Sequence, residues 1–190
     1  MLKQGLCMSE NFNIGDIARY FNEKGEYFCK SFDQTEGDES WVFIKPVRLS
    51  GYDCNVEINV TLQPDENLII FMMPLYGDGT EGLIGEHIDT FDSALHNLNS
   101  RTKGGYFTKY TYDETYAPIF VHQLPLNRMD YKWFKGTLDY FIDIVIAFRP
   151  VLDRMIHELG LMFDTRAGVN DSGRTYLISS AEQYQQIAGW

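Results

Sequence analysis

The chain has 190 residues, of which 44% are hydrophobic and 15% aromatic, and its formal net charge is −11 at pH 7. This length and composition exclude an intrinsically disordered chain and predict one globular domain, residues 1–190, with a substantial apolar core. The negative charge disfavours nucleic acids and anionic membrane surfaces as partners, because both would repel it.

The cysteine pattern predicts a reducing compartment. Cys7, Cys29 and Cys54 are odd in number, and none forms a Cys-x-x-Cys pair. This pattern favours neither a disulfide framework nor a zinc site. The first residues contain no continuous apolar segment followed by a small-residue cleavage site, so no secretory signal is expected. We therefore expect the protein to be cytoplasmic.

The first part of the chain predicts a helix followed by an antiparallel meander. Apolar residues recur at helical spacing over Ile14–Lys24, and Gly25 is placed to end that helix. Three strands are then predicted: Glu26–Phe32, Trp41–Leu49 and Asp53–Leu62. The segment Leu68–Pro74 is apolar at every position, which indicates a central strand buried on both faces.

The second part predicts a helix, a hairpin and a long closing helix. Phe91–Arg101 is the helix, capped by Asp89 or Thr90, and Tyr106–Tyr112 with Pro118–Leu124 form the hairpin. Over Tyr131–Leu159 apolar residues recur at steps of three and four, which predicts a helix with a broad apolar face. Its apolar runs are too short to span a bilayer. A C-terminal extension, residues 160–190, follows and ends in a short helix from Ser180 to Ala188.

This order of elements indicates an α+β fold. The strands are linked by short turns rather than by helices, which is typical of an antiparallel sheet. Helices with one apolar face are expected to cover one side of that sheet.

The chain resembles the YbjN-like proteins, which share the fold of the type III secretion chaperones. The resemblance covers roughly Phe12 to Leu159 and is carried by the helix Phe91–Arg101, Gly105-Tyr106-Phe107, the hairpin, and Gln123-Leu124-Pro125-Leu126 before the long helix. It implies a curved antiparallel sheet covered by helices. In the chaperones it also implies small acidic homodimers that bind extended segments of client proteins. YbjN-like proteins are labelled sensory transduction regulators without an established biochemical activity.

Two short motifs match ligand-binding patterns but lack the required context. Gly77-Asp78-Gly79-Thr80-Glu81-Gly82 matches GxGxxG, yet no βαβ unit follows and its two acids would repel phosphate. His157-Glu158 begins HExxH, yet Leu161 stands where the second histidine would be. The acidic stretch Leu75–Ser100 lacks the spacing of a calcium loop. We therefore expect no cofactor, no metal and no catalytic residues.

The candidate partner-binding residues are methionines and tyrosines on the predicted sheet. Met72 and Met73 lie on opposite faces of the central strand, and Tyr106, Tyr110 and Tyr112 share one face of another. Both residue types adapt well to varied partners, although they also suit a core or a sheet edge.

The functional hypothesis is a non-catalytic protein-interaction module, chaperone-like or regulatory, that binds a protein or peptide. We expect it to form a homodimer through an apolar sheet face left bare over Leu68–Pro74 and the hairpin Tyr106–Leu124. The alternative is a small-molecule sensor or an enzyme with a pocket between the sheet and the helices.

Overall fold

The computed structural model of the protein describes residues 12–32, 39–49, 52–76, 82–112 and 115–164. The helices in this part are α1 (Ile14–Lys24), α2 (Ile88–Leu98) and α3 (Tyr131–Glu158). The strands are β1 (Phe28–Phe32), β2 (Glu39–Leu49), β3 (Tyr52–Gln63), β4 (Leu68–Pro74), β5 (Gly82–Ile84), β6 (Tyr106–Tyr112), β7 (Thr115–Pro125) and β8 (Met162–Asp164). Two short 3-10 turns, η1 (Asn99–Arg101) and η2 (Leu126–Arg128), precede β6 and α3.

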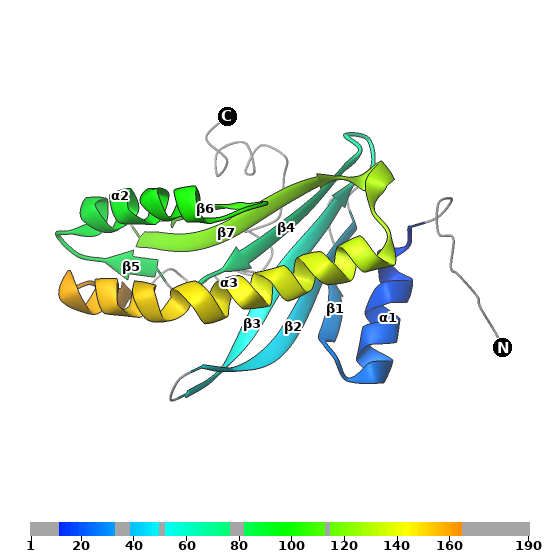
Figure 1. Cartoon of the computed structure of the whole chain (residues 1–190), viewed down its shortest axis with the longest axis horizontal. Helices are drawn as coiled ribbons and strands as arrows, with labels where there is room; N and C mark the ends of the chain where they lie inside the picture. Colours follow the sequence, from blue (N-terminus) through cyan, green and yellow to red (C-terminus); the bar gives the residue numbers. More distant parts are fainter. Residues whose placement is uncertain (1–11, 33–38, 50–51, 77–81, 113–114, 165–190) are drawn as a thin grey trace.

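The strands form one antiparallel sheet, as the sequence predicts. Their order is β1-β2-β3-β4-β7-β5-β8. Strand β6 pairs with β7 on the side of β7 opposite to β4. The sheet is curled, and α3 runs across its concave face between α1 and α2 (Figure 1). The expected α+β class is confirmed. No helix in the described ranges is long and apolar enough to cross a membrane.

Three phenylalanines on α3 hold that helix to the sheet. Phe134, Phe141 and Phe148 are each seven residues apart, so they fall on one face of the helix. The Phe134 ring lies 5.2 Å from Phe43 of β2 and 5.4 Å from Phe71 of β4. The other two rings contact β7 and β6: Phe141 is 5.1 Å from Phe120, and Phe148 is 5.1 Å from Phe107. The helix therefore bridges strands from nearly the whole width of the sheet.

The opposite face of the sheet carries a second, smaller apolar cluster. It consists of Ile70, Met72, Ile119 and Val121, each no more than 1% exposed. Leu68 and Tyr106 pack against these side chains. The expectation of a bare apolar face over Leu68–Pro74 and the hairpin Tyr106–Leu124 is therefore wrong, because the apolar side chains at its centre are buried within the single chain.

Several predicted boundaries need correction. Helix α2 begins at Ile88 after His87, so Asp89 and Thr90 lie in its first turn instead of capping it. It ends at Leu98, and the next three residues form η1. Strands β5 and β8 were not predicted. Each has only three residues, too few for an alternating pattern to stand out. The predicted helix Ser180–Ala188 lies outside the described residues.

A carboxylate fastens α2 to the β6–β7 hairpin. Asp92 accepts a 2.7 Å hydrogen bond from the Tyr116 hydroxyl and forms a 2.7 Å ion pair with Lys109. His96, one turn later, lies 3.5 Å from the same carboxylate. Burial alone would raise the pKa of Asp92, but the bonds from Lys109 and Tyr116 outweigh it, and the net effect lowers that pKa.

We predict that Asp92→Asn lowers the free energy of unfolding at pH 7 by about 1–3 kcal/mol, because a charge-assisted hydrogen-bond pair is lost. The pKa of the native Asp92 is depressed, so its contribution is present above the unfolded pKa of about 4 and is lost as the pH falls through the native value. Urea unfolding of both proteins from neutral to acidic pH measures this, and the difference between them should shrink towards low pH.

The matched control is Asp53→Asn, since Asp53 is 80% exposed and lies 3.8 Å from Arg48, itself 88% exposed. A surface pair of this kind should change stability by less than about 1 kcal/mol. Equal effects of the two substitutions would contradict the role given to Asp92.

Candidate functional site

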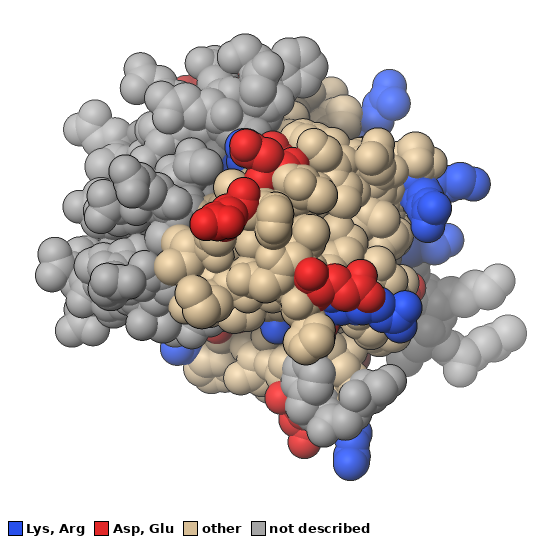
Figure 2. All heavy atoms as spheres, turned by 90° about the vertical axis from the view of Figure 1, so that its left-hand side faces the viewer, with Lys and Arg blue, Asp and Glu red and all other residues tan. Residues whose placement is uncertain are grey.

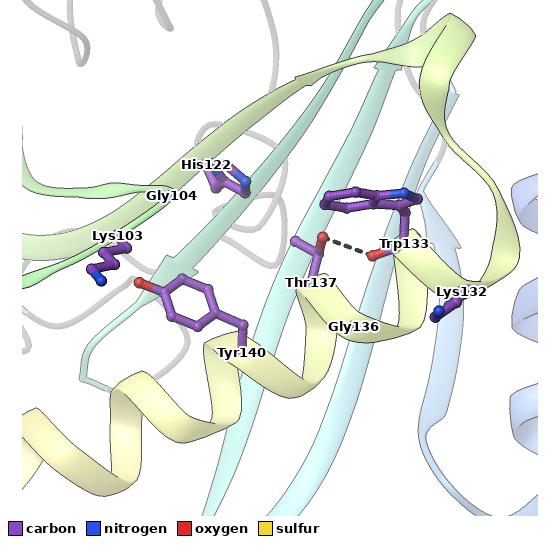
Figure 3. A pocket seen from close by; sticks show the side chains of 8 residues that line it. All are labelled: Lys103, Gly104, His122, Lys132, Trp133, Gly136, Thr137 and Tyr140. Carbon is purple, nitrogen blue, oxygen red and sulfur yellow. Dashed lines mark hydrogen bonds between the residues drawn. The ribbon is translucent and has the colours of Figure 1, made fainter.

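A cavity of about 430 Å³ opens between the first turns of α3 and the sheet. Lys132, Trp133, Gly136, Thr137 and Tyr140 line it from α3, His122 from β7, and Lys103 with Gly104 from the loop before β6 (Figure 3). His122 and the core residue Phe120 are two residues apart on β7, so their side chains lie on the same face of the sheet. The cavity therefore lies on the concave side, which α3 covers. The alternative hypothesis of a small-molecule site requires a cavity in this position, and that function stays a prediction.

The loop that brings Lys103 to the cavity is held in place by its own polar groups. The side chain of Asn99 donates to the Phe107 carbonyl at 3.0 Å and accepts from the Phe107 amide at 2.5 Å. The Thr102 hydroxyl lies 3.2 Å from the Gly105 carbonyl. Gly105 has φ +156° and passes so close to Phe120 that a Cβ there would lie 2.5 Å from the ring. Glycine at this position therefore lets β6 start directly against the core.

The start of α3 is fixed by a helix cap and by a turn. The Asp130 side chain accepts a 2.7 Å hydrogen bond from the Trp133 amide, which satisfies one of the free N–H groups at the helix start. Asn67, in the turn between β3 and β4, accepts 2.9 Å bonds from the amides of Leu126 and Asn127 in η2. These bonds fix the position of the first turn of α3, and with it the α3 wall of the cavity.

The two ends of the cavity differ in chemistry. At one end the Tyr140 hydroxyl points towards Lys103, with His122 nearby; at the other, the Trp133 indole lies beside Thr137 (Figure 3). Burial lowers the pKa of His122, so its imidazole is neutral at pH 7. Burial raises the pKa of Tyr140, and the nearby backbone of Lys103 offsets part of that rise. The polar end thus presents a neutral imidazole, a phenol and an ammonium group.

Of the predicted partner-binding residues, Met72, Met73 and Tyr106 do not line this cavity. Met72 and Met73 are both fully buried, on opposite faces of β4 as predicted. Tyr106 is half-buried against the outer cluster, and its hydroxyl is buried without a hydrogen bond in the described part of the chain. The side chains of Tyr110 and Tyr112 lie outside the described residues. The role of these five residues in partner binding stays a prediction.

A second candidate surface lies at the edge strand β8. Within the described residues β8 pairs only with β5 and ends the strand order. Its side chains Met162 and Phe163 are 63% and 42% exposed. The Phe163 ring lies 5.0 Å from that of Tyr76, and the Arg149 guanidinium stacks 3.7 Å above Tyr76.

Contacts from α3 hold this stack rigid. Arg149 donates to Asp153 at 3.0 Å and to the carbonyl of Leu75. The Tyr76 hydroxyl donates to the same carboxylate at 2.9 Å. Beside it, a cavity of about 250 Å³ is lined by Leu75, Val145 and Arg149 together with residues of β3. Sequence reasoning missed this surface, because Tyr76, Arg149 and Phe163 are far apart in the chain and carry no shared pattern.

Metal-binding and thiol chemistry find no support at either surface. Within the described ranges, no group of three or more His, Cys, Asp or Glu side chains is arranged to hold a metal ion. Burial raises the pKa of Cys29 to about 12 and also raises that of Cys54. Neither thiol is therefore ionised at neutral pH. Most of the GxGxxG segment, residues 77–81, lies outside the described residues.

We predict that Gly136→Ala raises the free energy of unfolding by about 0.5–1 kcal/mol, because glycine inside a helix is less favourable than alanine. A Cβ on Gly136 would meet no atom within 4 Å, so the change introduces no clash. Gly105→Ala is the matched control and should destabilise, since its Cβ would overlap Phe120. Thermal and urea unfolding measure both, and a destabilising Gly136→Ala would contradict an open cavity beside α3.

Comparison with known proteins gives a likeness of fold. The sequence matches no protein-family model and no curated protein. The structure is similar to that of YbjN, a proposed transcription regulator from E. coli, with a TM-score of 0.47 and 14% identity over 80% of this chain and 96% of that one. It is also similar to a chain of the ExsC–ExsE complex, with a TM-score of 0.43 and 14% identity over 71% of this chain and 89% of that one. At this identity the likeness is one of fold alone, the fold that the resemblance drawn from the sequence implies.

Proposed function

We propose that the protein is a non-catalytic interaction module that binds a protein or peptide partner at the β8 edge. The observation that carries this proposal is the exposure of two large apolar side chains, Met162 at 63% and Phe163 at 42%, on the last strand of the sheet. An apolar edge strand is a template for pairing with an extended segment of another chain. The partner is expected to add a strand along β8, with its own side chains packing beside Met162 on one face of the sheet and beside Phe163 on the other.

The opposite edge of the sheet supports this assignment by contrast. Strand β1 also exposes an aromatic side chain, Phe28 at 55%, but the ammonium group of Lys30 lies 5.0 Å from the centre of that ring. A lysine on an edge strand disfavours pairing with another chain, because strand addition would bury its charge. The three residues of β8 include no lysine, and their one charged residue, Asp164, stands at the end of the strand.

The charge of the molecule indicates the kind of partner. The end formed by α2, β5 and the C-terminal turns of α3 shows a broad uncharged surface dotted with acidic groups, and the basic groups lie mainly at its margin (Figure 2). The net charge of the whole chain is −11. A partner segment with apolar side chains flanked by lysine or arginine would fit this surface best.

We propose that binding takes place without catalysis and in the cytoplasm. The raised thiol pKa values leave no ready cysteine nucleophile among the described residues. Cys29 and Cys54 are free thiols, which suits a reducing compartment. A second candidate function, the binding of a small molecule, is favoured by one specific observation: the cavity between α3 and β7, with its three convergent polar groups.

Site-specific photocrosslinking in the native host tests the β8 proposal. With p-benzoylphenylalanine in place of Phe163, we expect discrete crosslinked products whose partner peptides mass spectrometry identifies. The matched control carries the same group in place of Phe28, which is also exposed on an edge strand. Crosslinks that are equally strong at both positions, or absent at Phe163, would contradict the proposal. The recombinant partner should then lose binding to a Met162→Ser, Phe163→Ser double variant that remains folded.

The expected homodimer is a separate proposal. Two copies with a charge of −11 each repel at long range, so apolar burial must dominate if they associate. Added salt should then leave the dimer intact or tighten it, because screening weakens only the repulsion. Light scattering after size-exclusion chromatography at low and high salt measures the mass. A species of 22.0 kDa, the mass of one chain, in both buffers would contradict the dimer.

A further inference from the structure

We propose that the cavity between α3 and β7 binds a small aromatic carboxylate, a planar ring system that bears one carboxylate group. This inference rests on the second candidate function above and is independent of partner binding at β8. The volume of about 430 Å³ suits a small molecule, since ligand cavities run from about 300 to 1,000 Å³.

The polar end of the cavity is suited to a carboxylate. The hydroxyl of Tyr140 is buried, and although the Lys103 backbone lies close enough to lower its pKa, the hydroxyl proton has no acceptor within the described part of the chain. A buried hydroxyl without a partner is unfavourable, and a ligand oxygen placed beside it would accept the missing bond. Lys103 is exposed at the mouth of the cavity, and the phenol of Tyr140 points towards it (Figure 3). An ammonium and a phenol aimed at one place form a site for a negative oxygen.

The other end of the cavity is suited to a flat apolar ring. Trp133 is 63% exposed although it is the largest side chain on α3, and its indole borders the cavity. Next to it Gly136 leaves space, since a Cβ there would have no atom within 4 Å. An aromatic ring lying on the indole would cover apolar surface that now faces water. The two ends together fix the direction in which such a ligand lies.

The helix start argues for a single negative charge rather than a phosphate. The N-terminus of an uncapped helix attracts phosphate through its free N–H groups. Here the carboxylate of Asp130 occupies the Trp133 amide at 2.7 Å and brings its own negative charge to the first turn. The cationic side chains that line the cavity are Lys103 and Lys132, and Lys132 lies beyond Gly136, away from Tyr140 (Figure 3). Of the two lysines, only Lys103 lies at the Tyr140 end, so one negative charge is matched there.

Calorimetric titration with naphthoate tests the ligand class. Naphthalenemethanol, which has the same rings without the charge, is the first comparison, and inorganic phosphate and adenosine monophosphate are the second. We expect naphthoate to bind at least about tenfold more tightly than each of the others. Equal binding of the alcohol would overturn the carboxylate assignment, and tighter binding of either phosphate compound would overturn the choice of a monoanion.

Three variants locate the binding. Tyr140→Phe should leave the melting temperature of the unliganded protein unchanged or raised, because it deletes an unsatisfied hydroxyl, and should weaken naphthoate binding several-fold. Gly136→Leu should fill the cavity and abolish binding in a folded protein. Lys103→Gln should weaken binding, whereas Lys30→Gln, a lysine on β1 far from the cavity in the chain, should not. Naphthoate affinity unchanged in both Tyr140→Phe and Gly136→Leu would place the ligand elsewhere and defeat the proposal. Crosslinking from the Phe163 position is unaffected by any of these results, so the two proposals fail separately.

Discussion

The contact between the phenylalanine face of α3 and the concave face of the sheet is the interaction on which the structure depends. Phe134, Phe141 and Phe148 lie against aromatic rings from β2, β4, β7 and β6. Burial of the Phe134 and Phe141 rings contributes about 1.5–3 kcal/mol each, the half-buried Phe148 contributes less, and edge-on ring geometry adds to these contributions. The contact reaches from β2 to β6, which do not pair with each other, so α3 ties together strands that backbone pairing links only through intervening strands.

Both candidate surfaces follow from the way α3 lies. Its first turns diverge enough from β7 to leave the cavity beside Trp133, where Gly136 adds no side chain to close the gap. Its last turns hold the stack of Arg149 on Tyr76, which supports the β8 edge. One helix thus borders both the cavity proposed for a small molecule and the edge strand proposed for a partner chain.

Periodicity predicted most of the fold, and it failed where function is proposed. The long helix, the buried strand Leu68–Pro74 and the opposite facing of Met72 and Met73 all follow from spacing alone. Strand β8 has three residues and no usable pattern. The cavity joins Lys103, His122 and Tyr140 from three elements, and only their packing brings them together. A bare outer face was expected because a sequence does not show which side chains cover others.

Native-state hydrogen exchange tests the central claim that α3 and the sheet form one cooperative unit. If α3 is held by its phenylalanine face, the amides in its buried middle, around Leu138 to Val145, exchange only through global unfolding, with the same free energy as those of β4 and β7. The short edge strand β8 should exchange through smaller local openings. Amides of α3 that exchange at a free energy well below that of β4 would show that the helix detaches on its own, and this result would contradict the account.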